Sequence, residues 1–174
     1  MKQKILLILT IFTMGTLMAN GQTAERKKHD TSVVYGFSPF TFHDIWDDTH
    51  SIGIFSVQYL YNPAKWLGIG VMIGLQHFEA NKSWSYSGND YTAMFLLRAN
   101  WINKPNFMLY SKAGIGSTIQ HENNSLNENN NDNAAALQIS LIGTNFSLGK
   151  DFFGMAELGI GSQGLLMLGA GYKF

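Results

Sequence analysis

Apolar and polar side chains alternate at every second position along much of the chain after residue 31. In the segment 91–102, the odd positions are Tyr, Ala, Phe, Leu, Ala and Trp, whereas the even positions include Thr92, Arg98 and Asn100. A period of two is typical of β-strands, because successive side chains of a strand point to opposite faces. The pattern predicts strands at residues 32–40, 51–61, 66–78, 91–102, 107–120, 134–147, 152–162 and 164–174.

A glycine-rich phrase recurs within these strands. Residues 67–70, 113–116 and 158–161 read Leu-Gly-Ile-Gly or Ala-Gly-Ile-Gly, and residues 168–171 read Leu-Gly-Ala-Gly. The first three copies begin about 45 residues apart, which is the length of two membrane-crossing strands with a turn and a loop. Each copy places glycines on one face and apolar side chains on the other, as in a strand with a crowded inner face and an outer face toward hydrocarbon.

The connections between the predicted strands alternate in length. Short segments with turn-forming residues lie at 62–65, 103–106 and 149–151, and longer polar segments lie at 41–50, 79–90 and 121–133. The connection around residues 162–164 is short where a long loop is expected. Short turns at one end and long loops at the other are typical of outer-membrane barrels. The fold class predicted is all-β, an antiparallel up-and-down transmembrane barrel of eight strands, with periplasmic turns and extracellular loops.

Alternation also assigns side chains to the two faces of the barrel wall. It places Leu97 and Leu158 toward lipid, and it places Arg98, Lys112 and Glu157 in the lumen. Four further polar residues are expected around these charges: Gln58, Gln76, Gln138 and Ser140. Because eight strands leave an interior that side chains can fill, we expect a satisfied polar core, with a gated polar pathway as the functional alternative.

Aromatic residues gather where the predicted strands meet the tight turns: Tyr59, Tyr61, Trp66, Trp101, Phe107, Phe146, Phe152, Tyr172 and Phe174. This placement predicts a girdle at a membrane interface. A soluble β-sandwich or a ligand-carrying barrel of the lipocalin type, with the same aromatics in its core, is the alternative.

The N-terminus predicts export. Lys2 and Lys4 precede an apolar run from Ile5 to Phe12, and Ala19-Asn20-Gly21 fits a cleavage site before Gln22. We therefore expect a signal peptide at 1–21, a periplasmic segment at 22–31 and a barrel domain at 32–174. A retained membrane anchor is the alternative, although polar residues interrupt the apolar run. The chain has no cysteine, so neither a disulfide nor a lipoprotein acylation site is present.

Charge follows the predicted topology. The longer segments contain Asp44, Asp47, Asp48, Glu79, Asp90, Glu122, Glu128 and Asp132 against the single base Lys82. The predicted periplasmic pieces contain Arg26, Lys27, Lys28, Lys65, Lys104, Lys150 and Lys173 against Glu25, Asp30 and Asp151. An acidic outer rim and a basic inner rim follow. The formal net charge of the chain is +0, which gives no reason to expect nucleic-acid binding.

The last strand carries a family resemblance. Leu166, Leu168, Ala170, Tyr172 and Phe174 alternate and end the chain on phenylalanine. This ending resembles that of the outer-membrane β-barrel superfamily, and the short chain is similar to its OmpX, OmpW and OmpA transmembrane types. The resemblance implies location in the bacterial outer membrane, contact with its lipid, a monomeric state, and recognition of Tyr172 and Phe174 by the barrel-assembly machinery. It implies no catalytic or cofactor site.

Candidate chemistry is sparse. His43, Asp44, Asp47, Asp48 and His50 lie within eight consecutive residues and could bind a divalent ion, but they lack the spacing and the glycine of a calcium loop. A plain acidic loop is the preferred interpretation, and no metal, cofactor or catalytic residue is predicted. The pairs His77 with Glu79 and His121 with Glu122 invite a lipid-hydrolase interpretation. The His-x-Ser arrangement on one strand that is typical of lipid A deacylases does not occur in this sequence.

Three functions remain open from the sequence. The first is a non-enzymatic barrel whose extracellular loops, including the asparagine-rich tract 123–133, make structural, adhesive or other surface contacts with an unidentified partner. The second is a narrow channel or a conduit for small apolar ligands of the OmpW kind. The third is a lipid-modifying hydrolase of the outer membrane.

Overall fold

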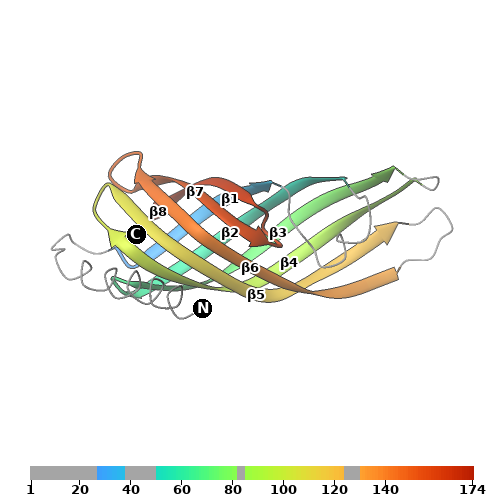
Figure 1. Ribbon diagram of the computed structural model, residues 1–174, viewed down its shortest axis with the longest axis horizontal. Helices are drawn as coiled ribbons and strands as arrows, with labels where there is room; N and C mark the ends of the chain where they lie inside the picture. The colour runs from blue at the N-terminus through green and yellow to red at the C-terminus, as the bar shows by residue number, and fades with distance from the viewer. Residues whose placement is uncertain (1–26, 38–49, 82–84, 124–129) are drawn as a thin grey trace, which may run out of the picture.

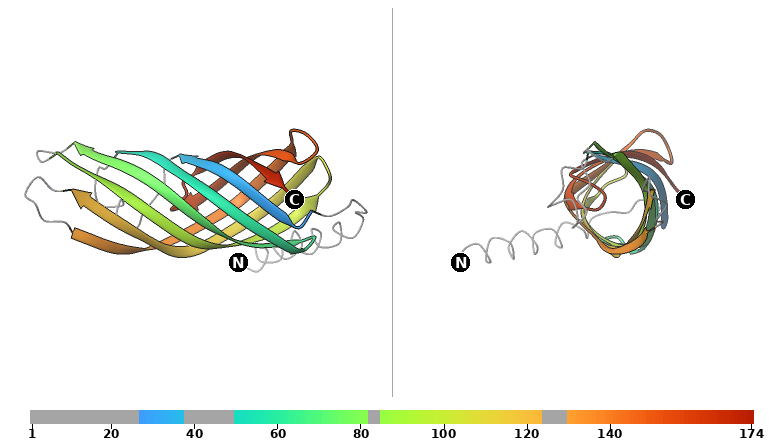
Figure 2. Two further views of the ribbon diagram at one scale, coloured as in Figure 1. Left: turned by 180° about the vertical axis from the view of Figure 1, so that it is seen from behind. Right: turned by 90° about the vertical axis from the view of Figure 1, so that its right-hand side faces the viewer.

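The computed structural model describes residues 27–37, 50–81, 85–123 and 130–174, and within these residues eight antiparallel strands close into a barrel (Figure 1). The strands are β1 (His29–Phe37), β2 (His50–Ala64), β3 (Leu67–Asn81), β4 (Ser85–Asn103), β5 (Phe107–Asn123), β6 (Asn130–Ser147), β7 (Phe152–Gly161) and β8 (Leu166–Lys173). Each strand pairs with the next, and β8 pairs with β1. The predicted fold class is therefore confirmed, and the view along the axis in Figure 2 shows the closed ring.

The two ends of the barrel differ. One end carries the connections 65–66, 104–106 and 148–151 together with the C-terminus, and we call it the turn end (left in Figure 1). At the opposite end, which we call the loop end, β1 stops at Phe37 and β6 begins at Asn130. No helix among the described residues is long and apolar enough to span a membrane. The predicted signal peptide at 1–21 lies outside the described residues.

Side chains alternate between the lumen and the outer surface as the sequence predicts. On β4, Leu97 is 54% exposed on the outer wall, whereas the next residue, Arg98, is 2% exposed and lies in the lumen. The same holds on β7 for Leu158 outside and Glu157 inside. A wall of exposed apolar side chains around a lumen that holds charged residues differs from a soluble barrel and suits a hydrocarbon environment.

Two predicted loops are largely strands. The segment 79–90 contains the end of β3 and the start of β4, and the segment 121–133 contains the end of β5 and the start of β6. These stretches are polar, so hydrophobic alternation does not reveal them, yet their backbones continue the ladders from Gln76↔Asp90 to Asn81↔Ser85. The first strand also differs from the prediction of 32–40 at its start, because β1 begins at His29, and residues 38–40 lie outside the described residues.

Strand lengths are unequal around the barrel. Strands β4, β5 and β6 have 19, 17 and 18 residues, whereas β1, β7 and β8 have 9, 10 and 8. The loop-end parts of β3 to β6 therefore extend beyond their shorter neighbours, as Figure 1 shows at the right. We call them the projecting sheet. Strand β6 pairs with β5 from Asn130 onward, but its pairs with β7 begin only at Gln138. Among the described strands, none pairs with the other side of β6 before that point.

The aromatic residues of the turn end face outward. Eight of the predicted girdle residues are exposed: Tyr59, Tyr61, Trp66, Phe107, Phe146, Phe152, Tyr172 and Phe174. Trp101 is half-buried. His29 lies among them, with its ring 5.3 Å from the rings of Tyr61 and Phe174. His29 and Phe174 also exchange two backbone hydrogen bonds of 3.0 and 2.9 Å, so the last residue completes the β1–β8 seam.

The facing of β4 leads to a stability prediction. Leu97→Arg places a cation on the lipid face, and we expect it to lower the free energy of unfolding by about 2–4 kcal/mol. Urea titration of the barrel folded into lipid vesicles measures this loss. Leu97→Phe is the matched control and should be close to wild type. Equal stability of Leu97→Arg and wild type would show that Leu97 does not face hydrocarbon.

Candidate functional site

Two cations face each other in the lumen. Arg98 on β4 and Lys112 on β5 are direct cross-strand partners, and each is 2% exposed. Like charges directly opposite each other in a sheet are destabilising, and a buried charge without a partner is strongly unfavourable. The surroundings of this pair must therefore supply negative charge.

The carboxylate of Asp30 on β1 neutralises Arg98. The Nη2 atom of Arg98 donates to Asp30 Oδ2 at 2.5 Å and to Asn62 Oδ1 at 2.8 Å. Gly68 is the cross-strand partner of Arg98 on β3, and a Cβ atom there would lie 2.9 Å from Asn62 Oδ1 and 3.3 Å from Arg98 Nε. The absence of a side chain at Gly68 therefore leaves room for the guanidinium and its amide partner.

The carboxylate of Glu157 on β7 neutralises Lys112. The Nζ atom of Lys112 lies 2.8 Å from Glu157 Oε2 and 2.9 Å from Oε1, and it also donates to Gln58 Oε1 at 3.1 Å. Glu157 accepts two further hydrogen bonds of 2.8 Å, from the hydroxyls of Tyr110 and Ser140. The carboxylate therefore has a partner on each side, as a buried charge requires.

Tyr110 joins the two ion pairs. Its hydroxyl donates to Glu157, and its ring lies 5.1 Å from the guanidinium carbon of Arg98. A Cβ atom at Gly143 would lie 2.3 Å from Cε2 of this ring, so only glycine allows the ring to reach across the lumen. Two cations, two carboxylates and one phenol form a connected and charge-balanced group, which we call the lumen network: Asp30, Arg98, Tyr110, Lys112 and Glu157.

Apolar and amide side chains occupy other parts of the lumen. One apolar cluster consists of Leu60, Met72, Met94, Leu96 and Ala136, and another of Val34, Phe153, Met155 and Met167. Toward the loop end, Gln138 accepts from the backbone N–H of Gln163 at 2.8 Å and donates to the carbonyl of Gly164 at 3.3 Å. Buried side chains thus occupy the lumen in the part of the barrel that the structure describes, as expected for eight strands.

The sequence found three of the five residues of the lumen network. Arg98, Lys112 and Glu157 are in the lumen as predicted, and so are the four polar residues Gln58, Gln76, Gln138 and Ser140. The sequence analysis missed Asp30, Asn62 and Tyr110.

Two acidic residues assigned to the rims are in fact buried. Asp30, assigned to the periplasmic segment, and Asp90, assigned to an acidic loop, are each 2% exposed in the lumen. The signal for Asp30 was present, because Asp30, Ser32 and Val34 continue one inward face of β1. The predicted strand began too late to include it.

Of the histidine candidates, the structure describes the side chains of His77 and His121, and both lie on the outer surface. His43, Asp44, Asp47 and Asp48 lie outside the described residues, as does the side chain of His50. His77 Nδ1 is 2.9 Å from Asn89 Oδ1, and the ring of His121 meets Tyr91 edge to face at 5.6 Å, on the outer surface. Within the part of the chain that the structure describes, no group of three or more His, Asp or Glu side chains could hold a metal ion.

A contact at the turn end ties the N-terminal segment to the last strands. Lys27 forms an ion pair with Asp151 and donates to the carbonyl of Lys173 at 3.1 Å. The hydrogen bond from the Lys27 ammonium lowers the pKa of the Asp151 carboxyl below its ordinary value. Because these groups are exposed, the contact contributes little to stability.

Comparison with known proteins finds similarity to solved structures and none to curated sequences. No protein-family model matches the chain, and no curated protein sequence matches it. The N-terminal β-barrel domain of Pseudomonas aeruginosa OprF superposes with a TM-score of 0.53 at 14% identity, covering 86% of this chain and 98% of that domain. Ail, an outer membrane protein of Yersinia pestis, gives 0.57 at 16% identity, covering 86% of this chain and 100% of Ail. The fold is that of the small outer-membrane β-barrels. At these identities the likeness extends to architecture only.

The lumen network leads to a double-mutant prediction. Lys112→Met or Glu157→Gln alone breaks a buried pair, and we expect Lys112→Met, which leaves the carboxylate without its cation, to lower the free energy of unfolding by about 3 kcal/mol or more. The double variant removes both charges and should recover most of that loss, because the two residues are coupled. Urea titrations in lipid vesicles measure all four proteins. Additive losses would contradict a direct pair.

Proposed function

We propose that the protein is a non-enzymatic barrel of the bacterial outer membrane that makes surface contacts through its loop end. The closed ladder supports a membrane location, since every strand has two neighbours over the membrane-spanning part of the wall. The exposed apolar wall and the aromatic residues at the turn end support the same location. In this orientation the turns and the C-terminus face the periplasm, and the loop end faces outward.

Assembly follows from the same proposal. Phe174 pairs with His29 at the seam, and the side chains of Tyr172 and Phe174 are exposed on the outer wall. We propose that the barrel-assembly machinery recognises both, as the resemblance of this ending to outer-membrane barrels implies. A closed ladder leaves no edge in the membrane for pairing with a second copy, so we propose a monomer.

The projecting sheet is the observation that carries the proposed surface role. Among the described strands it ends in an edge, since residues 130–136 of β6 pair there with β5 only. An edge of unpaired N–H and C=O groups can add a strand from another chain. The lumen gives less support to a channel or a hydrolase, because its charged groups are engaged with one another.

The charge of the loop end bears on the partner. The Ail structure compared above holds the heparin analogue sucrose octasulfate. In the present chain the sequence around the loop-end connections is acidic, with Asp44, Asp47, Asp48, Glu122 and Glu128 against Lys82. A polysulfated ligand bound at these connections is disfavoured by their charge, so we propose that they bind a protein partner with a basic surface.

Asn133 provides a test of the edge. Leu137 accepts a backbone hydrogen bond from Ser162 at 2.8 Å, so its backbone groups point toward β7. By strand alternation, the N–H of Asn133 points the same way and away from β5. Asn133→Pro therefore removes a donor from the free edge without breaking the β5–β6 ladder.

We expect bacteria that display Asn133→Pro to lose most of the adhesion to cultured epithelial cells and to one another that the wild type confers. Asn133→Ala, which keeps the N–H, is the matched control and should adhere like wild type. Heat-modifiable migration of the membrane fraction shows whether equal amounts of folded barrel are present. If cells with the wild type adhere no better than cells without the protein, the proposed surface role is wrong.

A further inference from the structure

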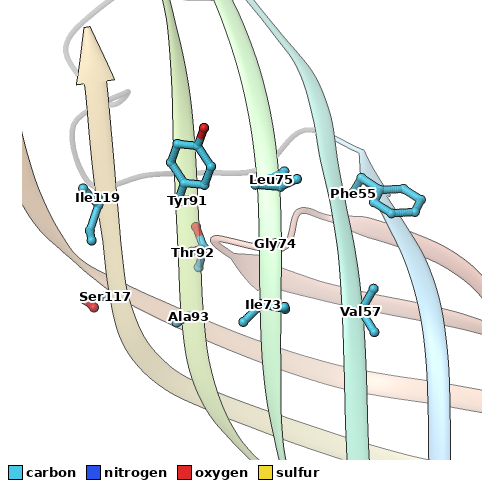
Figure 3. Close-up of a pocket in the computed structure, with 10 residues that line it drawn as sticks. All are labelled: Phe55, Val57, Ile73, Gly74, Leu75, Tyr91, Thr92, Ala93, Ser117 and Ile119. Atoms are coloured by element: carbon cyan, nitrogen blue, oxygen red, sulfur yellow. The ribbon is translucent and has the colours of Figure 1, made fainter.

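A groove crosses the outer wall of the barrel. It has a volume of about 380 Å³ and runs over β2 to β5 (Figure 3). Two neighbouring cross-strand rows form it. The row nearer the loop end is Phe55, Leu75, Tyr91 and Ile119, and the other is Val57, Ile73, Ala93 and Ser117. Its surface is almost entirely apolar, because Tyr91 and Ser117 contribute its few outward polar atoms.

Small side chains create the groove. Ala93 and Ser117 are cross-strand partners, and each lies between two large outward residues of its own strand. On β4 these are Tyr91 and Phe95, of which Phe95 is 72% exposed. On β5 they are Ile115 and Ile119, which are also exposed. The wall is therefore indented at one row, between two rows of bulky side chains.

A polar row borders the groove on its loop-end side. His77, Asn89 and His121 are consecutive cross-strand partners on β3, β4 and β5, one outward row beyond Leu75, Tyr91 and Ile119. His77 Nδ1 lies 2.9 Å from Asn89 Oδ1, and the His121 ring packs edge to face on Tyr91. The Tyr91 hydroxyl points away from Ala93 in Figure 3. Imidazole, amide and phenol groups thus stand where the apolar wall ends.

We propose that this groove binds an acyl chain of a phosphate-bearing membrane lipid, whose phosphate is held at the row His77, Asn89 and His121. This inference rests on the proposed membrane location. The side-chain N–H groups of Asn89 and the ring N–H of His121 can donate to phosphate oxygens, while His77 holds the Oδ1 atom of Asn89. A hydrocarbon chain covers an apolar groove that is unfavourably exposed to water. The order of the two parts, apolar groove and then donors toward the loop end, matches the order of chain and headgroup in the outer leaflet.

A lipid fits this site better than a soluble ligand does. The groove is open along the outer wall, at a depth that the proposed orientation places in the membrane, so hydrocarbon chains surround it. Its volume is within the range of small-molecule sites, about 300–1,000 Å³, which is enough for part of one chain and not for a folded partner. The donor row then distinguishes one lipid from another by its headgroup.

Native mass spectrometry of the barrel released from detergent tests the proposal with three probes. Phosphatidylglycerol and diacylglycerol with the same chains differ in the phosphate, and glycerol phosphate lacks the chains. We expect phosphatidylglycerol to stay bound, diacylglycerol to bind more weakly and glycerol phosphate not to bind. Ala93→Phe fills the groove and should lower phosphatidylglycerol binding about tenfold, which corresponds to ~1.4 kcal/mol. The double variant His77→Ala/His121→Ala should remove the preference over diacylglycerol.

Ala113→Phe is the matched control, because Ala113 is a small, exposed outward residue of β5 outside the groove. It should bind like wild type. Equal phosphatidylglycerol binding by Ala93→Phe and Ala113→Phe would contradict acyl-chain binding in the groove. Equal retention of phosphatidylglycerol and diacylglycerol by the wild type would contradict the phosphate site. A dimer that Ala93→Phe abolishes would assign the groove to a second copy and overturn the proposal. Failure of all variants and wild type to insert into vesicles would instead contradict the membrane location.

Discussion

The structure depends on neutralising two cations that the β4–β5 register places opposite each other inside the barrel. Arg98 and Lys112 are nearly fully buried, and their carboxylate partners come from strands far away in the sequence, Asp30 on β1 and Glu157 on β7. Since a buried charge is stable only when paired and hydrogen-bonded, both pairs require the closed barrel. The lumen network therefore links the beginning, the middle and the end of the chain, and we infer that it favours one register of closure over its neighbours.

The outer surface follows a different constraint. Within hydrocarbon the outer wall must be apolar and every strand must be paired. Strands β1, β7 and β8 are just long enough to cross a hydrocarbon core and extend no further. Strands β3 to β6 continue beyond it with polar residues, and we propose that recognition takes place on this sheet, which the rigid barrel holds. The proposed lipid groove lies where the two regions meet. In this proposal the barrel separates stability, which comes from the lumen, from contacts with lipid and partner, which are made outside.

The sequence predicted the architecture because period-two alternation reports the environment of every second residue. It assigned Leu97 and Arg98 to the correct faces, and it found three of the five residues of the lumen network. It missed the projecting sheet, since a strand with polar side chains on both faces has no hydrophobic period. It missed Asp30 because the predicted first strand began at residue 32, so the inward face of β1 that includes Asp30 was cut short. A bulge in β6, where Leu141 and Ile142 both face outward, also breaks the alternation that the prediction used.

The claim that the lumen is filled and charge-balanced is tested most directly by ion conductance of the purified wild-type barrel in a planar lipid bilayer. The packed lumen network predicts no current above that of the lipid alone, at either sign of the applied voltage. Insertion must be verified in the same preparation by heat-modifiable migration, so that silence reflects a closed lumen. A steady ohmic current from the folded wild-type protein would contradict a filled lumen and would favour the channel interpretation.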